Sequence, residues 1–257
     1  MLKILHVDIE TAPVAAYVWG LWKNNVGTNQ IMSDWFMLTW SAKWHHEPEM
    51  YGDRLYSQEA LDQDDKRIMY SLWKLLDEAD VVIGHNGDKF DIPKINTRFV
   101  LNGMSPPSPY RSVDTLKIAK RKFKFSSNRL DYLGQLLGVG RKIDTGGFQL
   151  WTRCMQGEDA ALQEMLDYNQ QDVLLLEDVY DKLMPFASIH PSHTAAQENL
   201  DDPTCPKCGS DDLHKRGYAY TNMSKFQRFR CNDCSSWSRS RINERSKNDM
   251  HKTLMPI

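Results

Sequence analysis

The amino-acid sequence predicts an α/β domain, a mixed sheet flanked by helices, followed by a small cysteine-rich domain. Short apolar runs of β-forming residues alternate with segments of helical periodicity along residues 1–188. Residues 189–203 lose that periodicity and collect His, Ser, Pro and acidic residues, as a linker does. Residues 204–257 hold four of the five cysteines. We therefore expect two domains joined by the linker 189–203.

Composition places the chain among ordinary globular proteins, with 41% hydrophobic and 26% charged residues. At 257 residues it can hold one sizeable core and a small appendage, or two modest domains. No apolar run approaches the roughly 20 residues that a membrane span needs. Asp8 interrupts the N-terminal apolar run too early for a signal peptide. We expect a cytoplasmic protein without a membrane partner.

Charge is distributed unevenly. From Thr204 onward there are 11 Lys and Arg against 5 Asp and Glu, a net charge of +6. The preceding residues have 21 against 29, a net charge of −8. An acidic body with a basic tail suits a body that binds metal ions and a tail that seeks polyanions, although small segments also differ in charge by chance.

The first strand carries two acids. Leu2–Val7 is an apolar run, Asp8 to Thr11 continue it, and Pro13 ends it. Residues two apart on a strand face the same side, so Asp8 and Glu10 point together and repel each other. That repulsion is tolerable at a water-exposed strand end or around a cation.

Further elements follow in a regular order. A hairpin of two strands with a turn at His45 and His46 precedes a helix, a buried strand and a helix that Asp91 begins or caps. Asn128 is expected to cap a later helix that Gly138 stops. The expected strands are 35–44, 49–56, 80–84 and 111–114, and the expected helices are 57–78, 93–101, 115–122 and 128–137.

Two features stand outside this order. The segment 14–34 fits no element, and its Trp19 and Trp22 could stack nucleobases or belong to the core. Cys154 has no partner in the sequence and is expected to be a small buried hydrophobic residue.

A long helix is predicted at Ala160–Met184 from apolar residues at helical spacing. Tyr168 and Asp172 lie four residues apart on it, so both project from the same face. Phosphodiester cleavage by two divalent ions needs several carboxylates around one cleft. Asp8, Glu10, Asp91 and Asp172 could supply four, although each acid taken singly could be a surface residue.

Three motifs carry a resemblance to a family. They are Asp8-Ile9-Glu10-Thr11, then Asn86 with Phe90-Asp91, then Tyr168 with Asp172. In order and rough spacing they resemble the motifs of the DEDD (DnaQ-like) 3′–5′ exonucleases, in the branch that uses tyrosine. The likeness covers residues 1–185 and is strongest to the proofreading domains of family B DNA polymerases.

The resemblance implies an RNase H-like fold and hydrolysis of 3′ ends, most simply of single-stranded DNA. It implies that Asp8, Glu10, Asp91 and Asp172 bind two Mg²⁺ or Mn²⁺ ions and that Tyr168 assists the attacking water. It also implies that Asn86 and Phe90 shape the site and contact nucleic acid. A replication or repair protein is a possible partner.

The second constellation is a pair of CxxC motifs, Cys205/Cys208 and Cys231/Cys234, separated by 22 residues. This spacing predicts one structural Zn²⁺ held by four thiolates in a zinc ribbon, rather than free thiols or disulfides. The strand before the second pair and the residues after that pair carry basic and aromatic side chains. They suit nucleic-acid binding, or merely a solvated face, and the candidates are Lys225, Arg228, Arg230 and Arg239.

The sequence therefore predicts a metal-dependent 3′–5′ exonuclease with a nucleic-acid-binding zinc ribbon. Two alternatives use the same residues. One is a structure-specific endonuclease or RNA-processing nuclease with the same acids. The other is a non-catalytic nucleic-acid-binding protein in which the ribbon performs the whole function.

Overall fold

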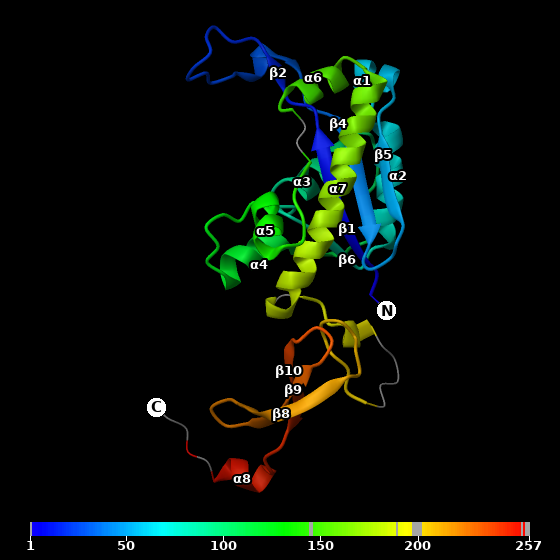
Figure 1. Ribbon diagram of the computed structural model, residues 1–257. Coiled ribbons are helices and arrows are strands. Elements are labelled where there is room, and N and C mark those ends of the chain that lie inside the picture. Colours follow the sequence, from blue (N-terminus) through cyan, green and yellow to red (C-terminus); the bar gives the residue numbers. More distant parts are fainter. Residues whose placement is uncertain (1, 144–145, 189, 197–201, 253, 255–257) are drawn as a thin grey trace. The chain divides into compact units, whose positions relative to one another are not determined.

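The structure, a computed structural model, describes residues 2–143, 146–188, 190–196, 202–252 and 254 (Figure 1). The chain forms two compact units, one within residues 3–181 and one from residue 182 onward. None of the described helices is long and apolar enough to cross a membrane. The predicted linker 189–203 lies partly outside the described residues, and the domain boundary at 188 stays a prediction.

A five-stranded mixed sheet forms the centre of the first unit. Its middle strand β1 pairs antiparallel with β4 and parallel with β6, and β5 and β7 form the edges. This order confirms the predicted mixed sheet. The strands, from one edge to the other, are β5 (Met50–Arg54), β4 (Met37–Trp44), β1 (Ile4–Thr11), β6 (Val81–Gly84) and β7 (Arg111–Asp114).

Strand β1 separates apolar from polar side chains. Leu5, Val7 and Ile9 alternate into the hydrophobic core. The residues between them face the long helix α7 (Asp159–Leu183), as the edge-on contact of His6 with Tyr180 shows, with ring centroids 5.2 Å apart. The period of two therefore sends the acids of β1 toward α7.

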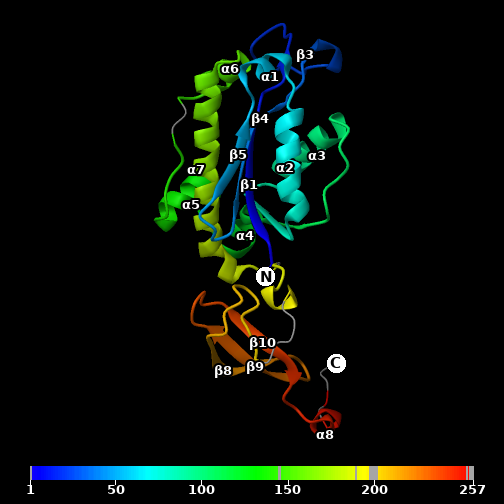
Figure 2. The same cartoon turned by 90° about the vertical axis from the view of Figure 1, so that its right-hand side faces the viewer.

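Helices cover both faces of the sheet. Figure 2 shows α7 on one face and α2 and α3 on the other. The buried residues Leu72 and Leu76 of α2 and Ile95 of α3 belong to the core. The helices besides α7 are α1 (Ser57–Asp62), α2 (Lys66–Glu78), α3 (Asp91–Leu101), α4 (Thr115–Lys122), α5 (Leu130–Leu137) and α6 (Gln149–Met155).

The predicted helix at 57–78 is wrong, because the chain forms two helices with Gln63 in a left-handed conformation (φ 59°) between them. The reason is Asp65, which is fully buried and accepts hydrogen bonds from the Met37 backbone N–H at 2.9 Å and from Arg98 at 2.8 Å. Satisfying a buried carboxylate outweighs one more helical turn.

One further prediction needs correction, and one helix was not predicted. Helix α5 begins at Leu130 with Arg129 at its N-cap, so Asn128 is not the cap. The Asn128 carbonyl instead accepts a hydrogen bond from His85 Nε2 at 2.8 Å. The sequence also gave no sign of α6, which buries Leu150 and Cys154. The buried position of Cys154 confirms the prediction for that residue.

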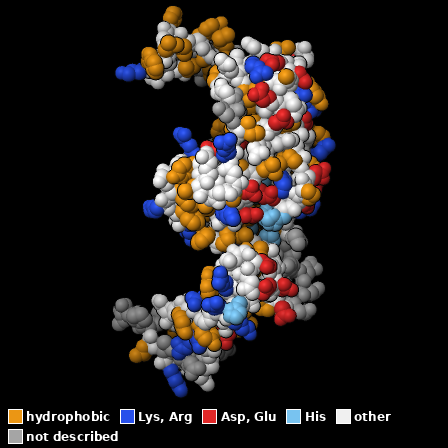
Figure 3. Space-filling view, in the orientation of Figure 1, with side chains coloured by type: hydrophobic (Ala, Val, Ile, Leu, Met, Phe, Trp, Pro, Cys, Tyr) orange, Lys and Arg blue, Asp and Glu red, His pale blue; other side chains and the backbone are white. Residues whose placement is uncertain are grey.

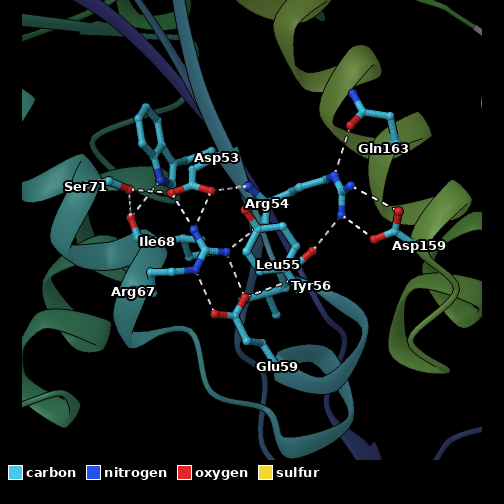
Figure 4. A network of polar contacts seen from close by, with 11 residues as sticks. Asp53, Arg54, Leu55, Tyr56, Glu59, Arg67, Ile68, Ser71, Asp159 and Gln163 are labelled. Carbon is cyan, nitrogen blue, oxygen red and sulfur yellow. Dashed lines mark hydrogen bonds and ion pairs between the residues drawn. The ribbon is translucent and has the colours of Figure 1, made fainter.

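A polar network joins β5 to α1, α2 and α7 (Figure 4). Arg67 of α2 donates to Asp53 at 2.8 Å and to Glu59 at 2.7 Å. Arg54 of β5 donates to Asp159 at 2.8 Å, at the first turn of α7. The network fixes the N-terminal end of α7, the helix that carries two of the predicted site residues.

The second unit contains a three-stranded antiparallel sheet in the order β10–β9–β8. Its strands are β8 (Leu213–Tyr220), β9 (Lys225–Cys231) and β10 (Trp237–Asn243). A sheet this small buries little apolar surface, and only Cys205, Phe229 and Cys231 among its described hydrophobic residues from 202 onward are buried. The small sheet and the cysteine pairs fit a zinc ribbon, as predicted. Short elements complete the chain: β2 (Ala15–Ala16), β3 (Ile31–Ser33), the 3₁₀ turns Thr28–Gln30, Met184–Phe186 and His193–Ala196, and α8 (Lys247–His251).

Candidate active site

Three of the four predicted acids converge between β1 and α7. One carboxylate oxygen each of Asp8, Glu10 and Asp172 lies within 4.8 Å of the others. Asn169, one turn before Asp172 on α7, donates a hydrogen bond to Asp8 Oδ2 at 2.6 Å. Asn169 is itself fully buried and lies 3.4 Å from Thr39 Oγ1 on β4. The strand and the helix thus supply one carboxylate cluster.

Asp91 approaches the same cluster from α3. It is the first residue of that helix and is buried, with a backbone hydrogen bond from Ile9 of β1. The turn before α3 is tight: a Cβ on Gly87 would lie 3.2 Å from the Gly84 Cα and 3.8 Å from Asp91 Oδ2. Gly84 and Gly87 approach each other closely, and a side chain at Gly87 would push the turn away from β6. The close approach therefore favours glycine at both positions.

Burial and mutual repulsion make the carboxylates hard to ionise in the absence of a cation. Burial raises the pKa of Asp8 well above its usual range, and the neighbouring Asp91, Glu10 and Asp172 add to the rise. Burial likewise raises the pKa of Glu10 to about 8 and that of Asp91 to about 7. The pKa of Asp172 is also raised by burial, although Lys142 opposes the rise. Bringing a cation to the cluster would relieve this repulsion.

Lys142 places a cation directly against these acids. Its ammonium group forms an ion pair with Asp172 Oδ2 and lies 3.1 Å from the Tyr168 hydroxyl. Burial disfavours its charge, but Asp172 and Asp8 outweigh that effect, so its pKa is raised. Tyr168 and Asp172 therefore share one face of α7, as their spacing of four predicts.

Asn86 lies in the turn after β6, with a left-handed backbone (φ 69°). Its backbone N–H donates to Asp114 Oδ1 at 3.0 Å, which ties the turn to the end of β7. Asn86 also lines a hollow of about 710 Å³ together with His85, Lys120 and Lys142. The residue therefore shapes the turn that precedes Asp91.

Phe90 borders a second hollow, of about 530 Å³. Its ring is 41% exposed, and the Lys94 ammonium lies 4.7 Å from its centroid. Lys94 also lies 4.2 Å from the Trp35 ring and donates to Thr11 Oγ1 at 2.7 Å. The lining is aromatic, with one cation, and the aromatic side chains are those of Trp35, Phe90, Phe148 and Trp151.

In the second unit the four predicted cysteines meet at one point. Their sulfur atoms all lie within 4.8 Å of one another. Cys205 Sγ is 3.6 Å from Cys234 Sγ, and Cys208 Sγ is 3.7 Å from Cys231 Sγ. Four sulfurs on a tetrahedral zinc are about 3.8 Å apart, given zinc–sulfur bonds of roughly 2.3 Å. The cluster is therefore compatible with zinc.

The predicted basic residues of the ribbon lie on β9 and β10. Arg239 stands directly opposite Arg228 in the register of the two strands, an arrangement of like charges that costs stability. Aromatic rings support them: Arg239 lies 4.0 Å from the Phe226 ring and Arg228 lies 4.9 Å from the Trp237 ring. Lys225 similarly lies 3.7 Å from the Tyr218 ring. Arg230 is exposed opposite Trp237.

Comparison with known proteins gives the family. Residues 46–184, more than half of the chain, match the RNase_H superfamily. The chain belongs to the RNase H superfamily. Among solved structures it is similar to the family B DNA polymerase from the hyperthermophilic archaeon Pyrobaculum calidifontis, with 18% identity and a TM-score of 0.51 over 72% of this chain. The chain spans 25% of that polymerase, and the likeness supports the fold. No curated protein gives a significant match.

The donor set of this RNase H superfamily site fits divalent metal ions. Members of the superfamily that are nucleases use divalent metals. Here three converging carboxylates and Asp91 offer the oxygen ligands that Mg²⁺ and Mn²⁺ prefer. Two of the oxygens, Asp91 Oδ1 and Asp172 Oδ1, are buried without a hydrogen-bond partner among the described residues. Unpaired buried carboxylate oxygens are costly unless a ligand satisfies them, so the residues present could hold such ions.

Two residues of the RNase H superfamily site escaped the sequence analysis. Lys142 lies in a polar loop with no periodic signal, and nothing in the sequence pairs it with Asp172. Asn169 could have been noticed, because it lies beside Tyr168 and three residues before Asp172 on a predicted helix. Its contact with Asp8 depends on how α7 packs on the sheet.

Proposed function

We propose that the chain is a metal-dependent 3′–5′ exonuclease that hydrolyses single-stranded DNA ends. The observation that carries the proposal is the convergence of Asp8, Glu10 and Asp172 within 4.8 Å, with Asp91 beside them. Bound cations would offset the repulsion between these buried carboxylates, which gives the cluster a chemical role. The superfamily and the polymerase neighbour support a nuclease acting on nucleic acid.

In this proposal Asp8, Glu10, Asp91 and Asp172 hold two Mg²⁺ or Mn²⁺ ions. The ions would neutralise charge on the scissile phosphate and lower the pKa of a water molecule. Asn169 orients the Asp8 carboxylate through its 2.6 Å hydrogen bond. Metal-binding carboxylates are commonly oriented by such a hydrogen bond from a residue that does not itself contact the metal.

Tyr168 orients the attacking water through its hydroxyl group. Burial raises the pKa of Tyr168 to about 12, and Asp172 adds to the rise, so the phenol keeps its proton at neutral pH. Lys142 lies 3.1 Å from this hydroxyl and fixes its position. The ammonium also balances part of the negative charge that the four acids gather.

The aromatic hollow beside Asp91 favours an unpaired terminal nucleotide. Its volume of about 530 Å³ suits one nucleoside, and Phe90 and Phe148 offer ring faces for a base. Lys94, which lies over the Phe90 and Trp35 rings, supplies a positive charge near the phosphate. A base that is still paired in a duplex could not enter such a hollow without separating from its partner.

The ribbon is proposed to bind one structural zinc and to hold nucleic acid. Four thiolates satisfy zinc completely and leave no open position for catalysis. Lys225, Arg228, Arg230 and Arg239 would contact phosphates, and the aromatic rings beneath them would stack on bases. A replication or repair protein would be a natural partner of such a nuclease.

Digestion of end-labelled oligonucleotides tests the proposal. The full-length protein is incubated with 5′-labelled single-stranded DNA, duplex DNA and RNA, with Mg²⁺ or Mn²⁺, and with a copy of each strand blocked at its 3′ end. A ladder of products shortened from the 3′ end, abolished by the block, is expected for single-stranded DNA. Equal cleavage of blocked and unblocked strands would indicate an endonuclease, and cleavage of RNA alone would indicate an RNA-processing enzyme. Absence of cleavage with every substrate and ion would refute a catalytic role.

A further inference from the structure

An arm leaves the sheet between β1 and β4. Residues 12–33 form it, with the short strands β2 and β3 paired near its base, and it projects away from the helices of its unit (Figure 1). Its hydrophobic side chains are turned outward, and Figure 3 shows them gathered over the arm. Trp19 is 101% exposed, Leu21 88% and Trp22 86%. The alternative that Trp19 and Trp22 are core residues is therefore wrong.

The arm keeps its hairpin form without burying these side chains. Backbone and amide groups hold it: Tyr17 N–H donates to the Gln30 carbonyl at 2.9 Å, and Gln30 Nε2 donates back to the Tyr17 carbonyl at 2.9 Å. The Gly27 N–H also donates to Gln30 Oε1 at 2.8 Å. At the base, Ser33 Oγ donates to Gln63 Oε1 at 2.8 Å. Neither tryptophan takes part in these hydrogen bonds, and a large exposed apolar group of this kind usually serves binding.

The charge of the arm favours an anionic polymer. Residues 12–33 contain no Asp or Glu, and Lys23, beside Trp22, is their one charged residue. The residues before Thr204 carry a net charge of −8, so an arm free of acids is an exception within that acidic body. Its remaining polar side chains are mostly amides and hydroxyls, which neither repel phosphates nor attract a basic protein surface.

The arm is continuous with the candidate active site. It begins directly after Thr11, and Thr11 follows Glu10 of the acid cluster. Pro13 and Val14, at its base, line the aromatic hollow that Phe90 also borders. A strand whose end lies in that hollow would pass the base of the arm, and this argues for the same polymer as occupant.

We propose that Trp19 and Trp22 stack on unpaired bases of a single-stranded nucleic acid and so hold the strand whose end enters the acid cluster. This inference rests on the proposed function for the position of the strand end. Trp19 is fully exposed, so both faces of its indole are open to a base. Stacking on aromatic side chains tolerates any base, because every base has a π-face. Lys23 would contact a phosphate between stacked bases.

Binding without cleavage tests the arm. Fluorescence anisotropy of a labelled single-stranded oligonucleotide, without added divalent ions, compares the full-length protein with the double variant Trp19→Ala/Trp22→Ala. Loss of each stacked base should weaken binding about ten-fold. Trp19→Phe/Trp22→Phe should keep most of the affinity, because an aromatic ring remains. The matched control is Val100→Ala/Leu101→Ala, which removes two exposed hydrophobic side chains from the end of α3.

Two nucleic-acid controls isolate stacking. An abasic strand keeps the phosphates but lacks the bases, so wild type and the Ala variant should bind it equally. Wild type and the Ala variant should also bind a blunt duplex with equal affinity. Equal affinity of wild type and Ala variant for the normal strand would overturn the inference. If the Ala variant also lost self-association in sedimentation while keeping that affinity, the arm would be a protein interface.

The test separates the arm from the proposed exonuclease activity. Arm-dependent binding by a protein that cleaves no substrate would support the arm inference and refute the exonuclease. Normal 3′–5′ digestion, together with equal strand binding by wild type and the Trp19→Ala/Trp22→Ala variant, would support the exonuclease and refute the arm inference. Circular dichroism of both variants checks that the fold is intact.

Discussion

The Asn169 side chain donates a hydrogen bond to Asp8 Oδ2 at 2.6 Å across 161 positions of sequence. This contact joins the middle strand of the sheet to the helix that carries Asp172. It also fixes which oxygen of Asp8 faces the other carboxylates. Asn169 is fully buried, so its amide serves this internal contact rather than a substrate.

Asp8→Ala should reduce Mg²⁺-dependent cleavage by more than about 100-fold, because it removes a proposed metal ligand. Asn169→Ala should reduce it by about 10- to 100-fold, because Asp8 remains but is less well oriented. Asp172→Ala should match Asp8→Ala. Initial rates across a range of Mg²⁺ concentrations measure this, with Asn96→Ala, which removes an exposed amide from α3, as the control. Near-wild-type turnover of Asp8→Ala would remove the proposed site.

Tyr168→Phe should lower turnover roughly ten-fold or more without changing metal affinity, because the hydroxyl is proposed to orient water and not to bind the metal. Lys142→Met should lower turnover as well, since Lys142 lies 3.1 Å from that hydroxyl. The double variant should lose less turnover than the product of the two single losses, because both changes disturb the Tyr168 hydroxyl, while Lys142 also pairs with Asp172. Single-turnover rates at saturating metal give the comparison. Fully additive losses would show that Lys142 acts independently of the phenol.

In metal-free protein the acid cluster should make stability fall as pH rises. The folded-state pKa values of Glu10, about 8, and Asp91, about 7, lie above the ordinary values of 4.5 for Glu and 3.8 for Asp. At pH values between the ordinary and the folded-state pKa, the folded state binds more protons than the unfolded state. The stability of the folded state therefore decreases from about pH 4 to about pH 8. Glu10→Gln should show a smaller decrease in Tm over this range than wild type.

Thermal unfolding in metal-free buffer at several pH values measures this effect. Wild type and Glu10→Gln share every other titrating group, so the difference between their Tm values reports the contribution of the Glu10 carboxylate. Adding Mg²⁺ should raise the Tm of wild type more at high pH than at low pH, because ions compete with protons for the carboxylates. A Tm difference between the two proteins that does not vary with pH would contradict the prediction.

Purified protein should contain about one zinc per chain. Cys205→Ser or Cys231→Ser should lose it and should unfold the ribbon, because the ribbon buries little core of its own. Cys154→Ser is the control, since that residue is buried in α6, in the other unit. Elemental analysis of protein prepared without chelators decides the question. A zinc content near zero in such protein would rule out the structural ion.

Removal of residues 204–257 should weaken nucleic-acid binding more than it slows cleavage at saturating substrate. These residues carry a net charge of +6, whereas the residues before them carry −8. Phosphate contacts release counterions, so the lost affinity should be greatest at low salt. Arg228→Ala/Arg239→Ala should reproduce part of the loss, because the two residues stand opposite each other on β9 and β10 and are both proposed phosphate contacts.

Binding to single-stranded and duplex DNA across a salt series, in an Asp8→Asn background, measures the contribution of the ribbon. Lys117→Ala offers a control for the loss of a single exposed cation outside the ribbon. Identical affinities and salt slopes of full-length and shortened protein would point to a protein partner for the ribbon.

Local patterns in the sequence determined much of this protein. The alternation along β1 placed Asp8 and Glu10 on one side, because a strand repeats every two residues. The spacing of four placed Tyr168 above Asp172 on one helical face. The two CxxC pairs identified a four-sulfur cluster, because few other arrangements explain that spacing. Each of these signals depends on residues that are close in sequence.

Tertiary structure alone decided which distant residues meet. Lys142 lies in a loop, and its ion pair with Asp172 depends on where that loop crosses α7. Asp65 broke a predicted helix because its buried carboxylate needed partners from β4 and α3. Trp19 and Trp22 have core-like hydrophobicity, yet within the part of the chain that the structure describes no element covers these two side chains. Burial and long-range contact depend on the packing of the whole domain, and a short stretch of sequence contains no record of that packing.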